Sequence, residues 1–231
     1  MIYLSTRLRN LWFLISRAHF SLLLRKIATR IYSSRYSYGL RRDLRNSIGL
    51  PEEPFALTIR PLTPVEVSTL LEVYRSEEDP NFDLEIIDRM EHVHADIPTC
   101  YGAFNEEGDL VFIQWLMGPD QNERIQSYFN SIYPVLAEGE ALLENALTLN
   151  GYRGHGVMGA AVARIAEIGK TRGVHTVITF VAEENEPSLR GCRRAGFLPY
   201  LLRHERWVMF RRKLEFTKLS GHSGWPAEFL D

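Results

Sequence analysis

The sequence predicts a mixed α/β domain that follows a basic helical extension. Short runs rich in β-branched and aromatic residues alternate with helical patterns from about residue 55 onward, as in a sheet flanked by helices. Apolar residues make up 45% of the 231 residues, which is enough for one sizeable core. Residues 1–50 hold ten Lys or Arg and one acidic residue, whereas residues 51–150 hold four basic and twenty acidic residues. We therefore expect an extension at 1–50, a folded domain at 51–216 and a C-terminal tail at 217–231.

The extension is expected to contain an amphipathic helix within residues 1–45. Its apolar residues recur at helical spacing, as in Leu4, Leu8, Leu11 and Ile15. Arginines divide the apolar runs, so neither a membrane-spanning helix of ~20 apolar residues nor a secretory signal fits. Three roles stay open: packing against protein, contact with an anionic membrane surface, and an Arg-rich transit peptide. For the membrane role, we expect a chain without residues 1–45 to keep the activity of the folded domain and to lose co-sedimentation with anionic vesicles.

The folded domain is expected to begin with a strand and two helices. A strand at 55–60 stops at Pro61, because proline cannot donate a ladder hydrogen bond. A helix at 64–76 follows, since a threonine cap precedes a proline at its first position. Apolar residues at helical spacing predict a second helix at 82–95.

The remaining elements are three strands followed by alternating helices and strands. A polar turn that contains glycine separates the first two of these strands, which predicts a hairpin. A buried strand is expected where β-branched residues dominate. In order, the elements are strands at 99–104, 110–117 and 141–149, a helix at 156–172, a strand at 174–181, a helix at 187–194, and strands at 197–202 and 207–211.

The most informative segment is a glycine-rich loop, in which Gly154, Gly156 and Gly159 stand where a strand ends and a helix begins. Glycine lets the backbone approach a ligand closely, and a helix N-terminus presents unpaired amides, so together they favour a phosphate or pyrophosphate site. A tight turn with close helix packing explains the same glycines. The pattern also matches the dinucleotide-binding fingerprint GxGxxG. Glu183 follows it by roughly the ~20 residues that separate the fingerprint from the ribose-binding acid of such domains. Only 48 residues follow Glu183, too few for a doubly wound domain.

Two motifs resemble those of the general-control-related N-acetyltransferases, the GNAT superfamily. Residues 152–158, Tyr-Arg-Gly-His-Gly-Val-Met, are similar to the family's acetyl-CoA loop, (Q/R)xxGx(G/A). Residues 185–197, which start with asparagine and end in Gly-Phe, look like its downstream signature. The resemblance covers roughly residues 55–212. It implies a twisted, mostly antiparallel sheet in which two central strands splay apart and admit the pantetheine arm of acetyl-CoA.

The resemblance also implies the residues that contact acetyl-CoA. Two positions depart from the family pattern: Met158 replaces a glycine or alanine of the loop, and Cys192 stands where many members carry a tyrosine general acid. The second departure affects the usual protonation step, so we expect an ordered water or Tyr200 to share it. No metal is implied, and His92 and His94 lie on different faces of the expected helix. The implied cofactor contacts are Thr148, Arg153, Gly154, His155, Gly156, Val157, Met158, Gly159, Asn185 and Ser188.

Acyl transfer to an amine requires a base that removes an ammonium proton. Glu140 and Glu144 lie on the expected strand before the loop, four residues apart and therefore on one face. Members of the family often place the base on this strand. The catalytic candidates are therefore Glu140, Glu144 and Cys192, although either carboxylate is also typical of an exposed strand.

The expected function is transfer of an acetyl or other short acyl group from acyl-CoA to a small-molecule or peptide amine. The acidic excess of residues 51–150 favours a cationic acceptor and argues against nucleic-acid binding. Two cysteines without a CxxC spacing indicate a reducing compartment, the cytoplasm, with membrane contact through residues 1–45 as an open role. Two alternatives stay open: a degenerate CoA-binding sensor or scaffold, and a nicotinamide-dependent oxidoreductase that uses Gly154, Gly156 and Gly159.

Overall fold

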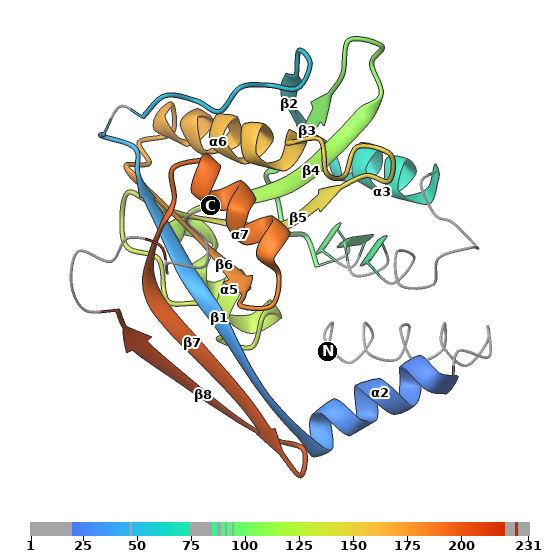
Figure 1. Ribbon diagram of the computed structural model, residues 1–231, viewed down its shortest axis with the longest axis vertical. Helices are drawn as coiled ribbons and strands as arrows, with labels where there is room; N and C mark the ends of the chain where they lie inside the picture. The colour runs from blue at the N-terminus through green and yellow to red at the C-terminus, as the bar shows by residue number, and fades with distance from the viewer. Residues whose placement is uncertain are drawn as a thin grey trace.

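One eight-stranded sheet organises the domain, in the order β2-β3-β4-β5-β6-β1-β7-β8 (Figure 1). The computed structural model describes residues 20–46, 48–73, 85–86, 89–90, 92–93, 95–219 and 225. All neighbouring strands are antiparallel except β5 and β6, which confirms the predicted mixed and mostly antiparallel class. The strands are β1 (Tyr32–Asp43), β2 (Thr58–Leu62), β3 (Cys100–Phe104), β4 (Leu110–Met117), β5 (Glu140–Thr148), β6 (Thr176–Ala182), β7 (Leu198–Val208) and β8 (Arg211–Lys218). The helices are α2 (Phe20–Ile31), α3 (Pro64–Val73), α5 (Asn122–Tyr128), α6 (Val157–Lys170) and α7 (Glu186–Arg194), with a 3-10 turn, η1 (Pro119–Gln121), before α5.

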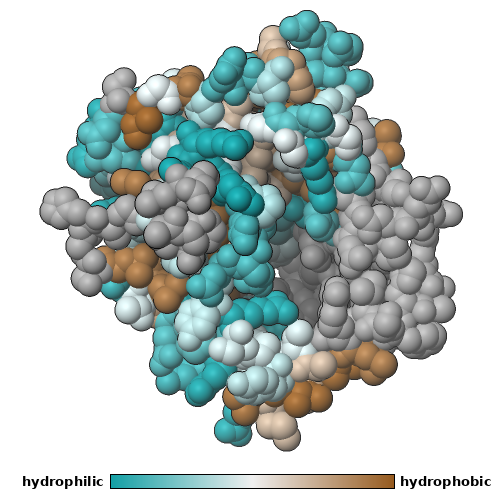
Figure 2. All heavy atoms as spheres, in the orientation of Figure 1, coloured by the Kyte–Doolittle hydropathy of each residue, from teal (hydrophilic) through white to brown (hydrophobic). Residues whose placement is uncertain are grey.

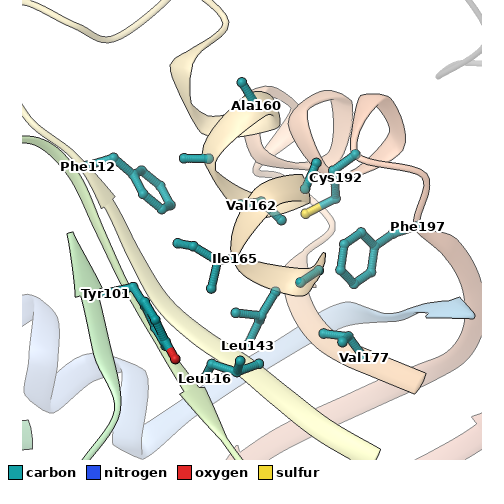
Figure 3. Close-up of a cluster of buried hydrophobic side chains, with 14 of the residues drawn as sticks. Tyr101, Phe112, Leu116, Leu143, Ala160, Val162, Ile165, Val177, Cys192 and Phe197 are labelled. Atoms are coloured by element: carbon teal, nitrogen blue, oxygen red, sulfur yellow. The ribbon is translucent and has the colours of Figure 1, made fainter. Parts of the chain in front are cut away.

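The sheet carries a buried apolar cluster on each face. On one face, Val162 and Ile165 of α6 share a cluster with Leu143 of β5 and with residues of α7 (Figure 3). On the other face, Leu71 of α3 and Ile125 of α5 belong to a second cluster with residues of β4 and β5. The central strands are therefore the middle layer of three, with both of their faces removed from water, whereas β8 at the edge is largely exposed.

Two strand boundaries differ from the expectation. Pro61, expected to end the first strand, lies inside β2 and stands opposite Tyr101 of β3. Because β2 is an edge strand, it tolerates a proline that an interior strand would reject. The strand expected at 197–202 is the first part of a longer strand, β7. The strand expected at 207–211 spans instead the end of β7, the turn at Met209 and Phe210, and the first residue of the unexpected β8.

The largest difference concerns the expected extension at residues 1–50. Its residues 32–43 form β1, which lies between β6 and β7 and pairs with both of them (Figure 1). Arg42 of β1 is buried, donates a hydrogen bond to the Ala163 carbonyl and forms an ion pair with Glu167 of α6. Such a partner is what allows an arginine to lie in a core. Part of the expected extension is therefore an interior strand of the domain.

Other predicted segments are only partly described. The expected N-terminal helix is described from Phe20 to Ile31 as α2, and its part before residue 20 lies outside the described residues. The expected tail at 217–231 is described at 217–219 and at Trp225, whose side chain is buried against the first cluster. Among the described helices, none is long and apolar enough to cross a membrane.

Candidate functional site

The site begins where β5 and β6 separate. Their parallel pairing runs from Glu140 opposite Thr176 to Leu142 opposite Ile178 and extends no further among the described residues. Just beyond it, the pairing of β5 with β4 shifts register, and Asn145 takes a left-handed conformation with φ of 61°. A bulge of this kind bends a strand locally. The sheet therefore opens between β5 and β6, as the resemblance implied.

A cavity of about 170 Å³ lies in this opening. Its walls come from both separated strands, from the first turn of α6 and from α7. Five residues that the sequence marked as candidates meet in it: Glu144, Met158, Asn185, Ser188 and Cys192. The other lining residues are Arg89, Gln114, Asn145, Ala146, Thr179, Phe180, Val181 and Ala182.

The glycine loop leads into the N-terminus of α6 at one end of this cavity. Gly154 and Gly156 have φ of 84° and 83°, a conformation that side chains rarely adopt, and Gly156 is the N-cap of α6. Ala160 donates the first hydrogen bond of the helix, to the Gly156 carbonyl at 3.4 Å. The amides before it have no acceptor within the helix, and the first turn holds no acidic residue. Such an N-terminus favours an anion.

The other implied cofactor contacts surround the loop. The Arg153 guanidinium donates to the Thr148 carbonyl at 3.0 Å and pairs with Glu85 at 3.1 Å, whereas His155 is exposed. Gly159 allows α6 and α7 to approach closely, because a Cβ there would lie 3.3 Å from the Gly191 carbonyl oxygen. Arg153 thus fixes the end of β5 to the loop.

Asn185 and Ser188 occupy the start of α7. The Asn185 side-chain oxygen accepts a hydrogen bond from the Ser188 amide at 3.3 Å and so caps the helix. Both residues also line the cavity. Asn185 therefore has a structural role in addition to the cofactor contact that the resemblance implies.

Glu144 presents a buried carboxylate to the cavity. Its Oε2 is buried, and no described residue gives it a hydrogen bond. Burial raises the pKa of Glu144, while the Tyr133 hydroxyl and the charges of Arg203 and Arg89 act in the opposite direction. A raised pKa makes a carboxylate in a cavity a stronger base than an exposed one, which suits it to accept a proton.

The structure separates Glu140 from Glu144. Glu140 lies at the closed end of β5, opposite Thr176, and its carboxylate accepts a hydrogen bond from the Ala137 amide at 2.9 Å. It is not among the residues that line the cavity. Glu144 is therefore the better placed of the two candidate bases.

Sequence reasoning missed the groups that face Glu144 from outside its strand. Tyr133 is buried in the segment between α5 and β5, and burial together with the charge of Glu144 raises its pKa. Arg203 of β7 donates to the Ile132 carbonyl at 3.1 Å and lies over the Tyr133 ring, 5.5 Å from its centroid. Tyr200, the phenol we expected near the reaction, does not line the cavity. No local pattern marks Tyr133, because its role depends on where the loop folds.

Cys192 is a buried thiol with a firmly held proton. It is 2% exposed and belongs to the apolar cluster of α6 and α7 (Figure 3). Burial, together with the charge of Glu144, raises the pKa of the Cys192 thiol to about 12, above the ~8.5 of a free cysteine. At neutral pH the Cys192 thiol is therefore protonated but is a weak acid, and its role as a proton donor stays a prediction.

We expect the substitution Cys192→Ala to reduce turnover by less than ~10-fold, because a thiol this weakly acidic contributes little proton transfer. The native thiol should also resist iodoacetamide until the protein is unfolded. Steady-state kinetics and mass spectrometry of alkylated protein measure the two effects. A loss beyond ~10³-fold, with folding and CoA affinity unchanged, would make the thiol the essential acid.

Comparisons with known proteins agree with this geometry. Residues 69–197 match the model of the GNAT acetyltransferase family. A fungal glucosamine N-acetyltransferase region, part of a multidomain GH3 β-N-acetylglucosaminidase, has a similar fold at 16% identity and a TM-score of 0.56, covering 85% of this chain and 23% of that one. A Drosophila protein aligns at 13% identity and a TM-score of 0.50, covering 84% and 59%. No curated protein sequence matches the chain.

The chain spans 59% of the Drosophila protein and 56% of a GCN5-related N-acetyltransferase from Sphaerobacter thermophilus, which aligns at 17% identity and a TM-score of 0.46 over 85% of this chain. A sheet that opens beside a glycine loop and a helix N-terminus defines the acyltransferase class of fold. The family match covers more than half of the 231 residues, and the chain belongs to the GNAT acetyltransferase family. The nicotinamide alternative does not agree with this assignment. A dinucleotide-binding domain needs several parallel strands, and the strands that the structure describes form one parallel pair.

Proposed function

We propose that the protein transfers an acetyl or other short acyl group from acyl-CoA to an amine acceptor by direct attack. The observation that carries the proposal is the Glu144 carboxylate, which faces the cavity between β5 and β6 and whose buried Oε2 has no hydrogen-bond partner among the described residues. Such an oxygen does not stabilise the fold, because burial of a polar atom without a partner costs free energy. An incoming amine supplies the missing donor.

Each part of the site has a role in this reaction. The amides at the start of α6 hold the pyrophosphate of acyl-CoA, and the opening between β5 and β6 admits its pantetheine arm. Glu144 removes a proton from the ammonium group, directly or through a water. The neutral nitrogen then attacks the thioester carbonyl and the carbon–sulfur bond breaks. The proton that the nitrogen loses as the amide forms passes, through water, to the departing CoA thiolate. An amide and free CoA result.

The acceptor is a small molecule or a peptide that carries an amine. Residues 51–150, which include β2 to β5, hold twenty acidic and four basic residues, and this charge attracts a cation. The fungal region of similar fold is named as a glucosamine N-acetyltransferase, and glucosamine is an acceptor that carries an amine.

Binding of CoA tests the donor half of the proposal. We expect the substitution Gly156→Val to weaken CoA binding by on the order of ten-fold or more, because valine cannot readily adopt φ of 83° and the first turn of α6 must shift. A Cβ at Gly156 has no atom within 4 Å, so backbone strain rather than crowding carries the effect. Isothermal titration of folded parent and variant measures it.

The matched control is Gly173→Val. Gly173 has φ of 78° and equally open surroundings, and it follows the other end of α6, about 21 Å away at 1.5 Å per residue. We expect this variant to lose stability without losing CoA affinity. Equal CoA affinity in Gly156→Val and the parent would remove the assignment of the loop. CoA binding without turnover on any amine of a broad panel would instead favour a sensor or scaffold.

A further inference from the structure

An exposed apolar tip lies at the far end of β1, β7 and β8. We define the apolar tip as Ile31, Tyr32, Val208, Met209 and Phe210, which are 44%, 68%, 43%, 70% and 62% exposed. The Met209 amide donates to the Ile31 carbonyl at 2.7 Å, and Tyr32 stands opposite Val208 in register. Five adjacent apolar residues therefore form one contiguous surface, fixed to the sheet.

The turn within the tip has an unfavourable sequence for its shape. Met209 and Phe210 connect β7 to β8, and both have positive φ, 48° and 64°. Turns with positive φ at both central positions strongly prefer Asn-Gly or Asp-Gly, because larger side chains are strained there. Two large apolar side chains are thus held in strained backbone and exposed to water. Met209 and Phe210 therefore do not stabilise the turn. Residues that are unfavourable for their own backbone conformation are commonly functional.

Basic residues outnumber acidic ones in the segments next to the apolar tip. Residues 30–36 and 204–215 together hold six Lys or Arg and two Glu, and the two Glu pair with Arg212 and Lys213. Arg206 and Arg211 are exposed and lie on β7 and β8, where Arg211 stands opposite Val208. These exposed arginines give the apolar tip a cationic rim. Such a surface is complementary to one with an anionic outer layer and an apolar interior.

The helix before β1 extends the same surface. Leu24, Ile27 and Ile31 of α2 are exposed and follow each other at spacings of three and four, so they form a stripe on one side of the helix. In Figure 2, apolar atoms gather at the lower edge of the molecule, where Figure 1 places α2 and the β7–β8 turn. Both α2 and the β7–β8 turn therefore place exposed apolar side chains at this edge of the molecule.

We propose that the apolar tip docks on a bilayer that contains anionic phospholipids, with Met209 and Phe210 inserted below the headgroups. Charge complementarity selects this occupant, because the rim attracts phosphate and serine headgroups while the tip enters the acyl region. The docking is peripheral and salt-sensitive, since exposed charges are screened. The proposal goes beyond acyl transfer and does not depend on it. It also moves the predicted membrane contact of residues 1–45 onto a folded surface that includes β7 and β8.

Flotation of the full-length chain with phosphatidylcholine vesicles, with and without phosphatidylserine, tests the docking. We expect binding only to the vesicles that contain phosphatidylserine, and weaker binding at high salt. The double variant Met209→Asn/Phe210→Gly should bind on the order of ten-fold or more weakly, because the inserted apolar surface is gone. It should also melt at a higher temperature than the parent, since it places the preferred residues in the turn. Loss of binding can then not be attributed to unfolding.

Val65→Gln is the matched control, because Val65 is 76% exposed on α3, away from the tip. We expect its vesicle binding to equal that of the parent. The proposal is overturned if the parent ignores anionic vesicles at low salt. It is equally overturned if the double variant binds vesicles as the parent does, because the contact then lies elsewhere. A double variant that loses binding to soluble polyanions in parallel would also overturn it and would indicate an acidic protein partner.

Discussion

Deletion of residues 1–45 is expected to abolish cooperative folding, and the acyl transfer that we propose should disappear with it. The deletion removes β1, which pairs with β6 from Ser37 to Asp43 and with β7 from Tyr32 to Arg41. Without it, two interior edges lose their hydrogen-bond partners, and the core loses the fully buried Leu40. A loss of this size exceeds the ~5–15 kcal/mol that stabilises a typical domain. The structure thus reverses the expectation that residues 1–45 are dispensable.

Deletion of residues 1–19 is the control for this experiment. It leaves every described element in place, so the shortened chain should still melt in one cooperative transition. Circular dichroism melting and size-exclusion chromatography compare the two deletions. A chain without residues 1–45 that melts cooperatively near the temperature of the parent would show that β1 is not needed.

A point substitution tests β1 in the full-length chain. A Cβ at Gly39 would lie 2.9 Å from Leu201 Cβ and 3.0 Å from the Phe180 ring, so Gly39→Val should lower the melting temperature sharply. Gly49→Val should have little effect, since a Cβ at Gly49 meets no atom within 4 Å.

The sequence could not predict β1 for identifiable physical reasons. The strand reads Tyr-Ser-Ser-Arg-Tyr-Ser-Tyr-Gly-Leu-Arg-Arg-Asp, which lacks β-branched residues and a clear alternation of apolar and polar positions. Its neighbours in the sheet begin at residues 176 and 198, so only long-range pairing makes it a strand. The charge of Arg42 predicts a surface position from sequence alone. Arg42 is buried because it forms an ion pair with Glu167. The family match begins at residue 69 and leaves β1 outside it.

The site was predictable where it depends on local backbone chemistry. The two glycine positions, Gly154 and Gly156, lie in the left-handed region, and the helix starts directly after them, as the loop motif predicts. What the sequence could not supply is the surroundings of a side chain. The sequence places Glu140 and Glu144 on one face of the same strand, with Glu144 nearer the expected opening. Only Glu144 lines the cavity, because the strands diverge between them. Tyr133 reaches Glu144 from a loop that carries no motif.

The substitution Glu144→Gln is expected to reduce turnover by on the order of 10²-fold or more while raising the melting temperature. Glutamine keeps the shape of the side chain but cannot take the ammonium proton, and a positioned base typically contributes ~10²–10⁴-fold. Stability should move the other way, because burial raises the pKa of Glu144 and an ionised Glu144 therefore costs free energy in the folded state. Between the unfolded pKa of ~4.3 and the raised folded pKa, the native protein binds more protons than the unfolded chain.

The pH dependence of both effects follows from this shift. The stability of the parent should fall as pH rises through that window, so the advantage of Glu144→Gln should be absent below the unfolded pKa and complete once the pH exceeds the raised folded pKa. Activity of the parent should rise through the folded pKa, since the base must be deprotonated. Glu140→Gln is the matched control, because Glu140 lies four residues earlier on β5 and outside the cavity, and its turnover should stay within about 2-fold. Parent-like turnover and an unchanged pH profile in Glu144→Gln, measured with acetyl-CoA and the best amine of a panel, would place the base elsewhere.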